Sequence, residues 1–335
     1  MGRGQNVATS RYCHLCGRLL AGRYLRYESG LTVCGSCEAT RPRCARCGVP
    51  LSDAAIASAH RSGNPALCGD CLRSAQRCSA CQQPLLGVFY TFENLLGPGP
   101  AENQRGGQTT GKGSIQGISQ ERKFCARCVQ HRPRCDLCSA PVAEGSTPVA
   151  DGQWRCEICS AELVLGEDGV RAVYRMATAL FATTVDSALR ETPQLEVVSR
   201  RELSALRQRY SRGTNGSRQD GDGHHVLGYF VSSHGRTTIY VERALPRPLL
   251  LGTLAHELGH AWQAEFAPGV RELLLSEGFA EWVAHRVLVA AGMQATAARA
   301  TRRDDIYGRG LRHFLEIERL SGRGGVLAAI KGPGN

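Results

Sequence analysis

Two absences limit the class of protein to which this sequence belongs. It contains no run of about eighteen apolar residues, so no membrane-spanning helix is predicted. Its opening, MGRGQNVATSRYC, lacks the apolar core of a secretory signal, and Asn6 stands where the N-myristoylation pattern requires Ser or Thr. We therefore expect a cytoplasmic protein that does not associate with membranes.

A third absence is that of cysteine from the second half of the chain. All sixteen cysteines precede residue 160, and each belongs to a C-x-x-C pair. Eight pairs supply four sites of four thiolates, which is a ligand set of structural zinc, whereas disulfides need no such pairing. We predict four structural zinc ions in a reducing compartment. The expected ligands are Cys13, Cys16, Cys34, Cys37, Cys44, Cys47, Cys68, Cys71, Cys78, Cys81, Cys125, Cys128, Cys135, Cys138, Cys156 and Cys159.

The spacing of the pairs indicates a repeat array. Three junctions have the same form, CGSCEATRPRCARC, CGDCLRSAQRCSAC and CARCVQHRPRCDLC. Sequential pairing of the C-x-x-C units is the simplest assignment, and a cross-braced arrangement competes with it. We expect one double zinc module over residues 11–75 and a second over 76–160. Within the second, residues 97–120 are rich in Gly, Gln, Ser and Thr, which predicts a disordered insertion.

The net charge of +11 at first suggests nucleic acid as a partner. Residues 1–160 carry 19 Lys and Arg against 11 Asp and Glu. Four zinc-tetrathiolate centres of charge −2 each would cancel that excess, so the arginines more plausibly offset thiolate charge than bind phosphate. We therefore do not expect a nucleic-acid partner.

The second half contains the pattern H-E-x-x-H, at His256 to His260. On a helix the two histidines share one face and can reach a single ion. Glu257 beside them is placed to act on water as a general base, and Glu277 would supply a carboxylate from a second helix. Glu281, one turn later, could orient a ligand histidine or face solvent.

Chance occurrence of this pattern on a solvated helix is the alternative. The residues around both segments are apolar, as in Leu249–Leu251 and Leu273–Leu275, so both helices are expected to be buried. Buried histidines and carboxylates without a partner are costly, and a metal ion supplies the partner. We therefore predict a catalytic zinc ion held by His256, His260 and Glu277.

Apolar periodicity outlines the remaining elements of residues 161–335. It predicts a helix over 167–189, a strand over 194–199, a helix over 201–210, and strands over 226–231 and 237–241. The segment 237–243 precedes the metal-binding helix, either as an edge strand to which a substrate could add or as a core strand. Because this half contains the whole proposed site and no cysteine, we expect it to fold and act without the array.

The cysteine array resembles LIM domains, tandem zinc modules that bind proteins. The resemblance lies in the segment from Cys13 to Tyr24, CHLCGRLLAGRY. Two features differ from that family. Cysteine stands at the third ligand position, where LIM domains usually have histidine, and six residues rather than two join successive zinc units.

The C-terminal part resembles the plant LIM-domain peptidases that limit organ growth and are activated by ubiquitination. The resemblance covers roughly residues 190–331 and is carried by TIYVERALPRPLLLGTLAHELGHAW, by EGFAEW and by the YGRGLR segment at Tyr307. It implies an α+β fold with a gluzincin-like zincin domain, endopeptidase activity on protein substrates, and ubiquitin or ubiquitin-like proteins as partners. The ubiquitin-interacting segments of plant members do not occur in this sequence.

Peptide hydrolysis also requires a donor for the developing oxyanion. The resemblance implies Tyr307, because related gluzincins carry a tyrosine near the start of a late helix. Other candidates are Tyr240, Tyr229, His234 and His225, whereas His285 is expected to pack or face solvent, and His14, His60 and His131 are not needed as ligands. We thus predict a zinc-dependent endopeptidase with an N-terminal zinc-finger module for recognition or regulation; the alternative is a non-enzymatic zinc-finger adaptor.

Overall fold

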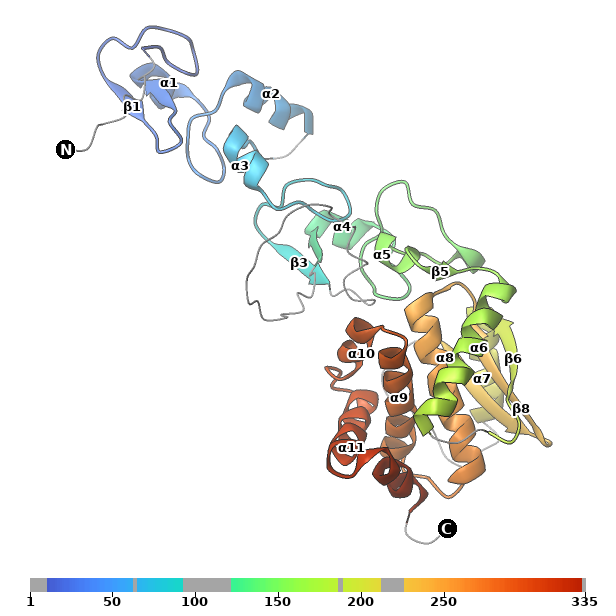
Figure 1. Ribbon diagram of the computed structural model, residues 1–335. Helices are drawn as coiled ribbons and strands as arrows, with labels where there is room; N and C mark the ends of the chain where they lie inside the picture. Colours follow the sequence, from blue (N-terminus) through green and yellow to red (C-terminus); the bar gives the residue numbers. More distant parts are fainter. Residues whose placement is uncertain (1–10, 63–64, 93–121, 186–188, 212–225, 333–335) are drawn as a thin grey trace. The chain divides into compact units, whose positions relative to one another are not determined.

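The computed structural model describes residues 11–62, 65–92, 122–185, 189–211 and 226–332 (Figure 1). The insertion expected at 97–120 lies outside these residues. The chain divides into two compact units. One comprises Met1–Tyr90 with Lys123–Ala126, and the other comprises Thr91–Arg122 with Arg127–Asn335.

The first part of the chain consists of short elements gathered around cysteines. Val33 is buried against Cys13 and Cys37, and Leu51 and Leu67 are buried against Cys44 and Cys71. Cores of this size bury too little apolar surface to fold unaided, so they require a further source of stability, which metal ions bound to the cysteines could supply. The elements are β1 (Tyr24–Arg26), β2 (Thr32–Cys34), α1 (Gly35–Thr40), α2 (Asp53–Ser62), α3 (Gly69–Ser74), β3 (Phe89–Phe92), β4 (Arg122–Cys125) and α4 (Ala126–His131).

The remainder of the chain is a mixed α/β assembly. No helix among the described residues is long and apolar enough to cross a membrane. The elements are η1 (Ala150–Gly152), α5 (Glu157–Ser160), β5 (Leu163–Val164), α6 (Glu167–Val185), β6 (Gln194–Val198), α7 (Arg200–Ser211), β7 (Gly228–Ser233), β8 (Arg236–Glu242), β9 (Leu245–Pro246), α8 (Arg247–Phe266), α9 (Leu273–Ala290), α10 (Gln294–Ala300) and α11 (Ile306–Lys331).

The main sheet has the strand order β6-β8-β7. β6 pairs parallel to β8, with Leu195 opposite Ile239, and β7 pairs antiparallel to β8, with Phe230 also opposite Ile239. The edge-strand interpretation of 237–243 is therefore wrong, because β8 has a partner on both sides. Among the described strands, β7 is the edge of this sheet that lies against α8.

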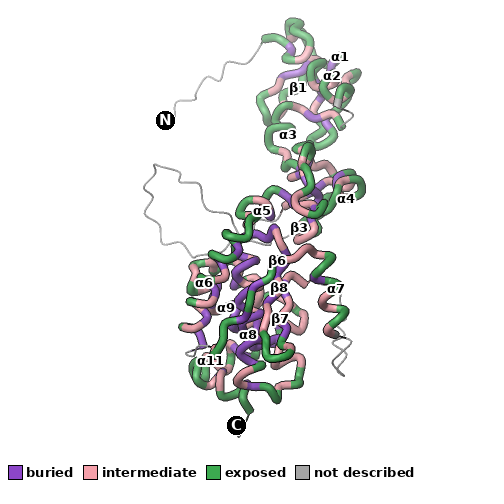
Figure 2. Tube along the Cα trace, turned by 90° about the vertical axis from the view of Figure 1, so that its right-hand side faces the viewer, coloured by how far each residue is buried: buried purple, intermediate pink, exposed green. Residues whose placement is uncertain are grey.

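The centre of this unit is α8, which packs against α6, α9, β7 and β8. Pro248 in the first turn favours helix initiation, and the helix ends before Pro268 and Gly269. Buried positions concentrate on α8, α9 and β8 (Figure 2). Trp262, Phe279 and Trp282 stack successively in the core, with ring centroids 5.0 Å and 5.7 Å apart. Dispersion and burial of these rings hold α8 and α9 together.

Glycines set the spacing between α8, α9 and α11. A Cβ on Gly259 of α8 would meet Ala280 Cα of α9 at 2.8 Å. A Cβ on Gly278 would meet Gly310 Cα of α11 at 2.6 Å, and the reverse approach is equally close. Because the opposing atoms belong to backbone, a side chain at these positions would force the helices apart.

The boundary between the compact units does not follow the end of the cysteine array. Residues 127–160, including the fourth cysteine cluster, belong to the same unit as residues 161–335. β5, which directly follows that cluster, pairs antiparallel with β9 at the start of α8. A boundary at 160/161 was expected because the cysteines stop there, but the pairing that joins the two segments is not local in sequence.

The helix spacing makes a testable prediction for Gly310→Ala. The added methyl group would collide with the α9 backbone, so we expect the free energy of unfolding to fall by about 1–3 kcal/mol or more. Thermal denaturation of the full chain measures the loss. Gly324→Ala is the control, in the part of α11 that follows the kink at Gly322, since its Cβ would meet nothing within 4 Å. We expect it to be neutral or stabilising by up to ~1 kcal/mol. Equal melting temperatures for the two variants would contradict the close-approach argument.

Candidate metal centres

The sixteen cysteines form four clusters of four, each built from consecutive C-x-x-C pairs. All sixteen thiols are free of disulfides. The sequential assignment is therefore confirmed and the cross-braced alternative is wrong. The clusters are Cys13, Cys16, Cys34 and Cys37; Cys44, Cys47, Cys68 and Cys71; Cys78, Cys81, Cys125 and Cys128; and Cys135, Cys138, Cys156 and Cys159.

The sulfur spacing in these clusters suits zinc. The Sγ atoms of Cys16 and Cys34 lie 3.8 Å apart, and those of Cys138 and Cys156 lie 3.6 Å apart. Tetrahedral zinc with Zn–S bonds of about 2.3 Å needs sulfurs about 3.8 Å apart, whereas a disulfide needs about 2 Å. The four clusters could thus hold four structural zinc ions.

Backbone groups around the first cysteine of a cluster favour its thiolate form. Cys34 N–H donates to Cys13 Sγ at 3.5 Å, and Cys68 N–H donates to Cys44 Sγ at 3.3 Å. Burial opposes the charged form, but these donors and other backbone N–H groups of the same C-x-x-C turn lower the pKa of both Cys13 and Cys44 to about 6. Metal ligation requires thiolates, so the backbone of these C-x-x-C turns favours metal binding.

A fifth group of potential ligands lies between α8 and α9. The Nε2 atoms of His256 and His260 are 3.1 Å apart, and Glu277 Oε2 lies 3.2 Å from the first and 3.4 Å from the second. Donors about 2.0–2.1 Å from a tetrahedral metal ion are separated by roughly 3.3 Å. The three residues selected from sequence are therefore brought together with the spacing that such an ion requires.

The opposite ring nitrogen of each histidine also has a partner. Glu281 Oε2 lies 3.2 Å from His256 Nδ1, so Glu281 takes the orienting position considered for it rather than facing solvent. Gln263 Oε1 lies 2.8 Å from His260 Nδ1. Sequence reasoning missed Gln263, although its position three residues after His260 on one helix could have indicated it. Both contacts hold Nε2 toward the shared centre.

The electrostatics of the group favour a cation. Burial opposes a charged imidazole, but the hydrogen bonds to Glu277 and Glu281 raise the pKa of His256 to about 10. Burial likewise acts to raise the pKa of Glu277, but His260 and His256 lower it well below its ordinary value. The arrangement stabilises positive charge at its centre, which is what a divalent ion would supply.

Glu257 lies beside the three donor residues and is almost fully buried. Burial raises the pKa of Glu257, while the nearby histidines lower it. Gly228 of β7 closes over this carboxylate, since a Cβ there would lie 3.0 Å from Glu257 Cγ and 2.6 Å from Thr253 Cγ2. Glycine at this position lets the edge strand approach Glu257.

Two cavities meet at these residues. One, of about 530 Å³, is lined by Leu249, Thr253, Leu288, Ile306 and Arg299 among others. The second, of about 240 Å³, is lined by Tyr229, Phe230, Val270 and Arg207 among others. The walls of both cavities include Gly228, His256, Glu257 and Tyr307.

Tyr307 is the second residue of α11, and its ring centroid lies 6.0 Å from that of His256. Burial raises the pKa of Tyr307 to about 12, so its hydroxyl keeps its proton at neutral pH. The guanidinium of Arg303 stacks over the ring at 4.8 Å and lies 3.8 Å from Glu281. Arg303, which sequence reasoning missed, thus contacts both Tyr307 and the partner of His256.

The other candidate residues do not join this group. Tyr240 and His234 line neither cavity, although Tyr229 lines the smaller one. His225 lies outside the described residues. His14 Nδ1 accepts a hydrogen bond from Thr32 N–H, and His285 lies on α9 near Arg286 and Glu318. His60 and His131 are exposed and, like His14, belong to none of the clusters in the described part of the chain.

Comparison of this chain with models of known protein families, with curated proteins and with solved structures finds no match.

Proposed function

We propose that the C-terminal part of this protein is a zinc-dependent endopeptidase of the gluzincin type. The observation that carries the proposal is the grouping of three ligand atoms, 3.1–3.4 Å apart, beside the buried carboxylate of Glu257 at the junction of two cavities. A scaffold or adaptor would gain nothing from burying Glu257, because burying a carboxylate costs stability even when, as here, it accepts a backbone hydrogen bond from Phe230. In a peptidase the same carboxylate would serve as the general base.

The donor set fits zinc, since two imidazoles and one carboxylate leave a position for water or substrate. His256, His260 and Glu277 would hold the ion. When bound, zinc would supply Lewis acidity that polarises the scissile carbonyl and lowers the pKa of water.

Glu257 acts as the general base. Its carboxylate accepts a proton from the attacking water, whose oxygen forms the new bond to the carbonyl carbon. The proton then passes to the amide nitrogen as the C–N bond breaks, which releases an amine and a carboxylic acid and restores Glu257. Because burial raises the pKa of Glu257, it is a stronger base than a solvated glutamate.

Tyr307 stabilises the developing oxyanion. Its hydroxyl remains protonated and therefore donates a hydrogen bond as negative charge accumulates on the carbonyl oxygen. Arg303 over the ring and the adjacent His256 limit the positions that the ring can adopt.

The substrate is a protein segment in extended conformation. β7 has one partner among the described strands, and its residues Gly228 to Phe230 line the cavities beside Glu257. A peptide adding to its free edge would pass the site with alternate side chains directed toward the two cavities. The leucines that line part of the larger cavity suit an apolar side chain of the substrate.

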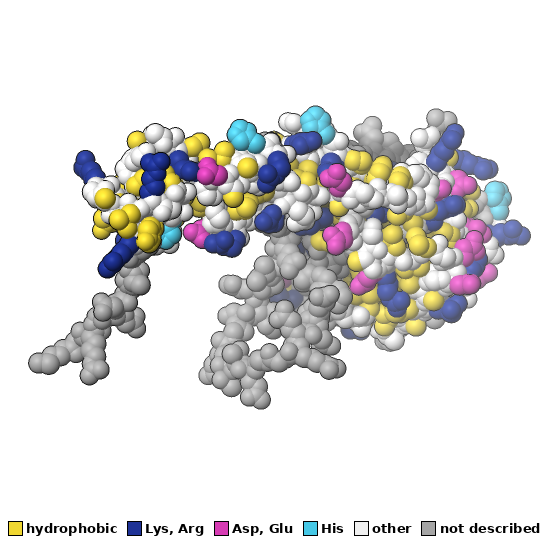
Figure 3. Space-filling model, turned by 90° about the horizontal axis from the view of Figure 1, so that it is seen from above, with side chains coloured by type: hydrophobic (Ala, Val, Ile, Leu, Met, Phe, Trp, Pro, Cys, Tyr) yellow, Lys and Arg dark blue, Asp and Glu magenta, His cyan; other side chains and the backbone are white. Residues whose placement is uncertain are grey.

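The N-terminal clusters are proposed as a protein-recognition or regulatory module rather than a nucleic-acid interface. On the face drawn in Figure 3, Lys and Arg side chains lie in separate small groups among apolar, acidic and uncharged ones. Several arginines are already paired, as Arg41 is with Asp53 and Arg132 with Glu144. A continuous basic stripe is what phosphate-backbone binding requires.

Glu277→Ala tests the metal site. Wild-type protein should contain about five zinc ions per chain, and the variant should contain about four, because the remaining two histidines bind zinc weakly. Metal analysis of purified protein measures the difference. Glu272→Ala is the control, since this exposed residue at the start of α9 makes no capping hydrogen bond. Full zinc content in Glu277→Ala would show that the third ligand is misassigned.

Glu257→Gln tests the general base. The amide keeps the shape of the side chain and cannot take up the proton, so hydrolysis of unfolded casein should fall about a hundredfold or more while zinc content is unchanged. Glu265→Gln, on the same helix and paired with Arg190 at 3.3 Å, is the matched control and should retain activity. A chelator should abolish wild-type hydrolysis. If Glu257→Gln hydrolyses casein at the wild-type rate, the proposed mechanism fails.

Tyr307→Phe tests the oxyanion donor. Loss of the hydroxyl should lower kcat about 10²-fold with little change in KM, because the hydrogen bond strengthens only as charge develops. Tyr229→Phe, which removes a hydroxyl from the smaller cavity, should leave kcat within a few-fold of the wild-type value. Equal kcat values for Tyr307→Phe and the wild type would restrict Tyr307 to packing.

A further inference from the structure

The fourth cysteine cluster differs from the other three at the residue that precedes its third cysteine. In the first three clusters this residue is Val33, Leu67 or Phe124, and each is a buried apolar side chain. In the fourth cluster it is Arg155, which is 2% exposed. A buried arginine needs partners, so this cluster must supply or contact acidic groups that the others do not need.

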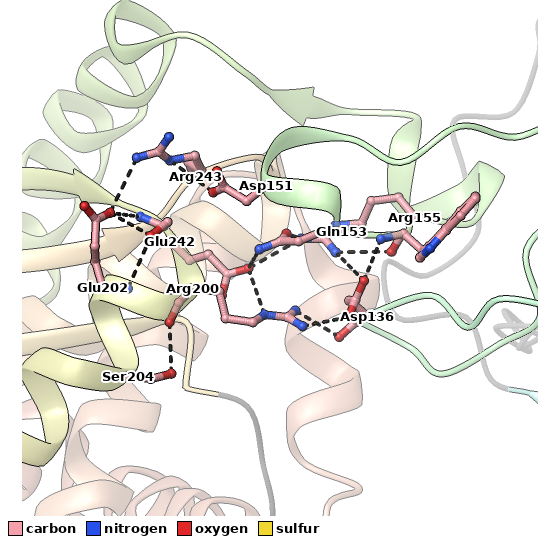
Figure 4. Close-up of polar contacts among 11 residues, drawn as sticks. Asp136, Asp151, Gln153, Arg155, Arg200, Glu202, Ser204, Glu242 and Arg243 are labelled. Atoms are coloured by element: carbon pink, nitrogen blue, oxygen red, sulfur yellow. Dashed lines mark hydrogen bonds and ion pairs between the residues drawn. The ribbon is translucent and has the colours of Figure 1, made fainter.

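The partners of Arg155 lie partly on the main sheet (Figure 4). Its guanidinium is 3.5 Å from Oε1 of Glu242, the last residue of β8, and it donates to the side chain of Gln153. Gln153 Nε2 in turn donates to Glu242 Oε1 at 2.9 Å. Arg200, at the start of α7, joins Asp136 at 2.7 Å and Glu242 at 3.5 Å.

Glu242 is the carboxylate on which these groups converge. Its side chain is 0% exposed, as is that of Arg155. A buried carboxylate is tolerated only when its partners are held in fixed geometry. Two of those partners, Gln153 and Arg155, come from the segment that leads into Cys156.

The cysteine ligands hold that segment in place. Asp136 follows Cys135 and Arg155 precedes Cys156, so each polar residue is adjacent to a ligand. Trp154 and Asp136 also join the two segments, through Trp154 N–H to Asp136 Oδ2 at 2.6 Å and Asp136 N–H to Trp154 O at 2.9 Å. Arg122 donates to the sulfurs of Cys156 and Cys138 at 3.1 and 3.2 Å.

Two paths lead from this network to the proposed active site. Glu242 N–H donates to Leu227 O at 2.8 Å, and the next residue is Gly228, which lies against Glu257. Separately, β5 pairs with β9, and Arg247 N–H at the start of α8 donates to Glu162 O at 2.8 Å. The first path positions the edge strand and the second positions the helix that carries both histidines.

We propose that the fourth cluster is a structural metal site of the catalytic unit itself. Metal bound there positions β8 and β7 through Arg155 and Glu242, and it positions α8 through the pairing of β5 with β9. The first three clusters have no such role. The expected loss of hydrolysis rests on the proposed function. The expected loss of structure in β7 and β8 and the expected change in metal content do not. Loss of the fourth metal ion therefore disables the His256 site without removing any of its ligands.

Matched ligand variants of the full chain test the metal dependence. Cys159→Ser removes the last ligand of the fourth cluster and Cys37→Ser removes the last ligand of the first, and each should empty its own cluster of zinc. Only Cys159→Ser should accelerate hydrogen–deuterium exchange in residues 227–242, by about tenfold or more, and lower zinc occupancy at the His256 site. Wild-type exchange in that segment of Cys159→Ser would overturn the proposal.

A second pair of variants keeps every ligand. Arg155→Met leaves Glu242 without its buried cation and should retain all zinc in the fourth cluster while accelerating exchange in the same segment. Arg132→Met, whose partner Glu144 is 80% exposed, is the control from the same region and should not. Equal exchange in the two variants would overturn the proposal. Because exchange and zinc content do not depend on turnover, an inactive wild type would reject the peptidase assignment and leave this coupling testable.

Discussion

The close approach of α8, α9 and α11 is the constraint on which the candidate site depends. Gly259 lies between the two ligand histidines in sequence, and a Cβ there would meet the α9 backbone at 2.8 Å. With a larger residue, α9 would move outward and Glu277 would no longer lie 3.2–3.4 Å from both Nε2 atoms. The absence of side chains at Gly278 and Gly310 likewise lets α11, and with it Tyr307, approach the site. Glycine is costly inside helices, and here the cost is offset by proximity.

Charge burial sets a second constraint. Two buried polar networks flank the main sheet and α8, one around His256, Glu277 and Glu281 and the other around Arg155 and Glu242. Each contains ionisable groups that would be unfavourable alone and that are satisfied by partners from distant segments. The first network is arranged around a shared centre for a cation. In the second, side chains adjacent to cysteine ligands neutralise a carboxylate on β8.

Metal ligation could take the place of apolar burial in the small cysteine-bearing modules, each of which has four cysteines positioned to hold an ion. Their cores consist mostly of the cysteines themselves with one or two aliphatic side chains. Such modules fold when metal is bound, so their stability follows metal supply. In the fourth cluster this dependence extends beyond the module, because Val142 and the cysteines pack beside residues that contact β8.

Local spacing in the sequence determined the parts of each candidate metal centre. A C-x-x-C pair, two histidines four residues apart and the offset from Glu277 to Glu281 follow from turn and helix geometry, which depends on neighbouring residues. Which C-x-x-C pairs combine was decided by the tertiary structure. Only the tertiary structure decided that β8 is a central strand, that Gln263 and Arg303 support the site, and that the fourth cluster joins the C-terminal unit. Those features depend on strand order and on pairing between segments such as Arg155 and Glu242, 87 residues apart. No periodicity within one segment encodes such a pairing, because it arises from packing that satisfies buried groups across the whole unit.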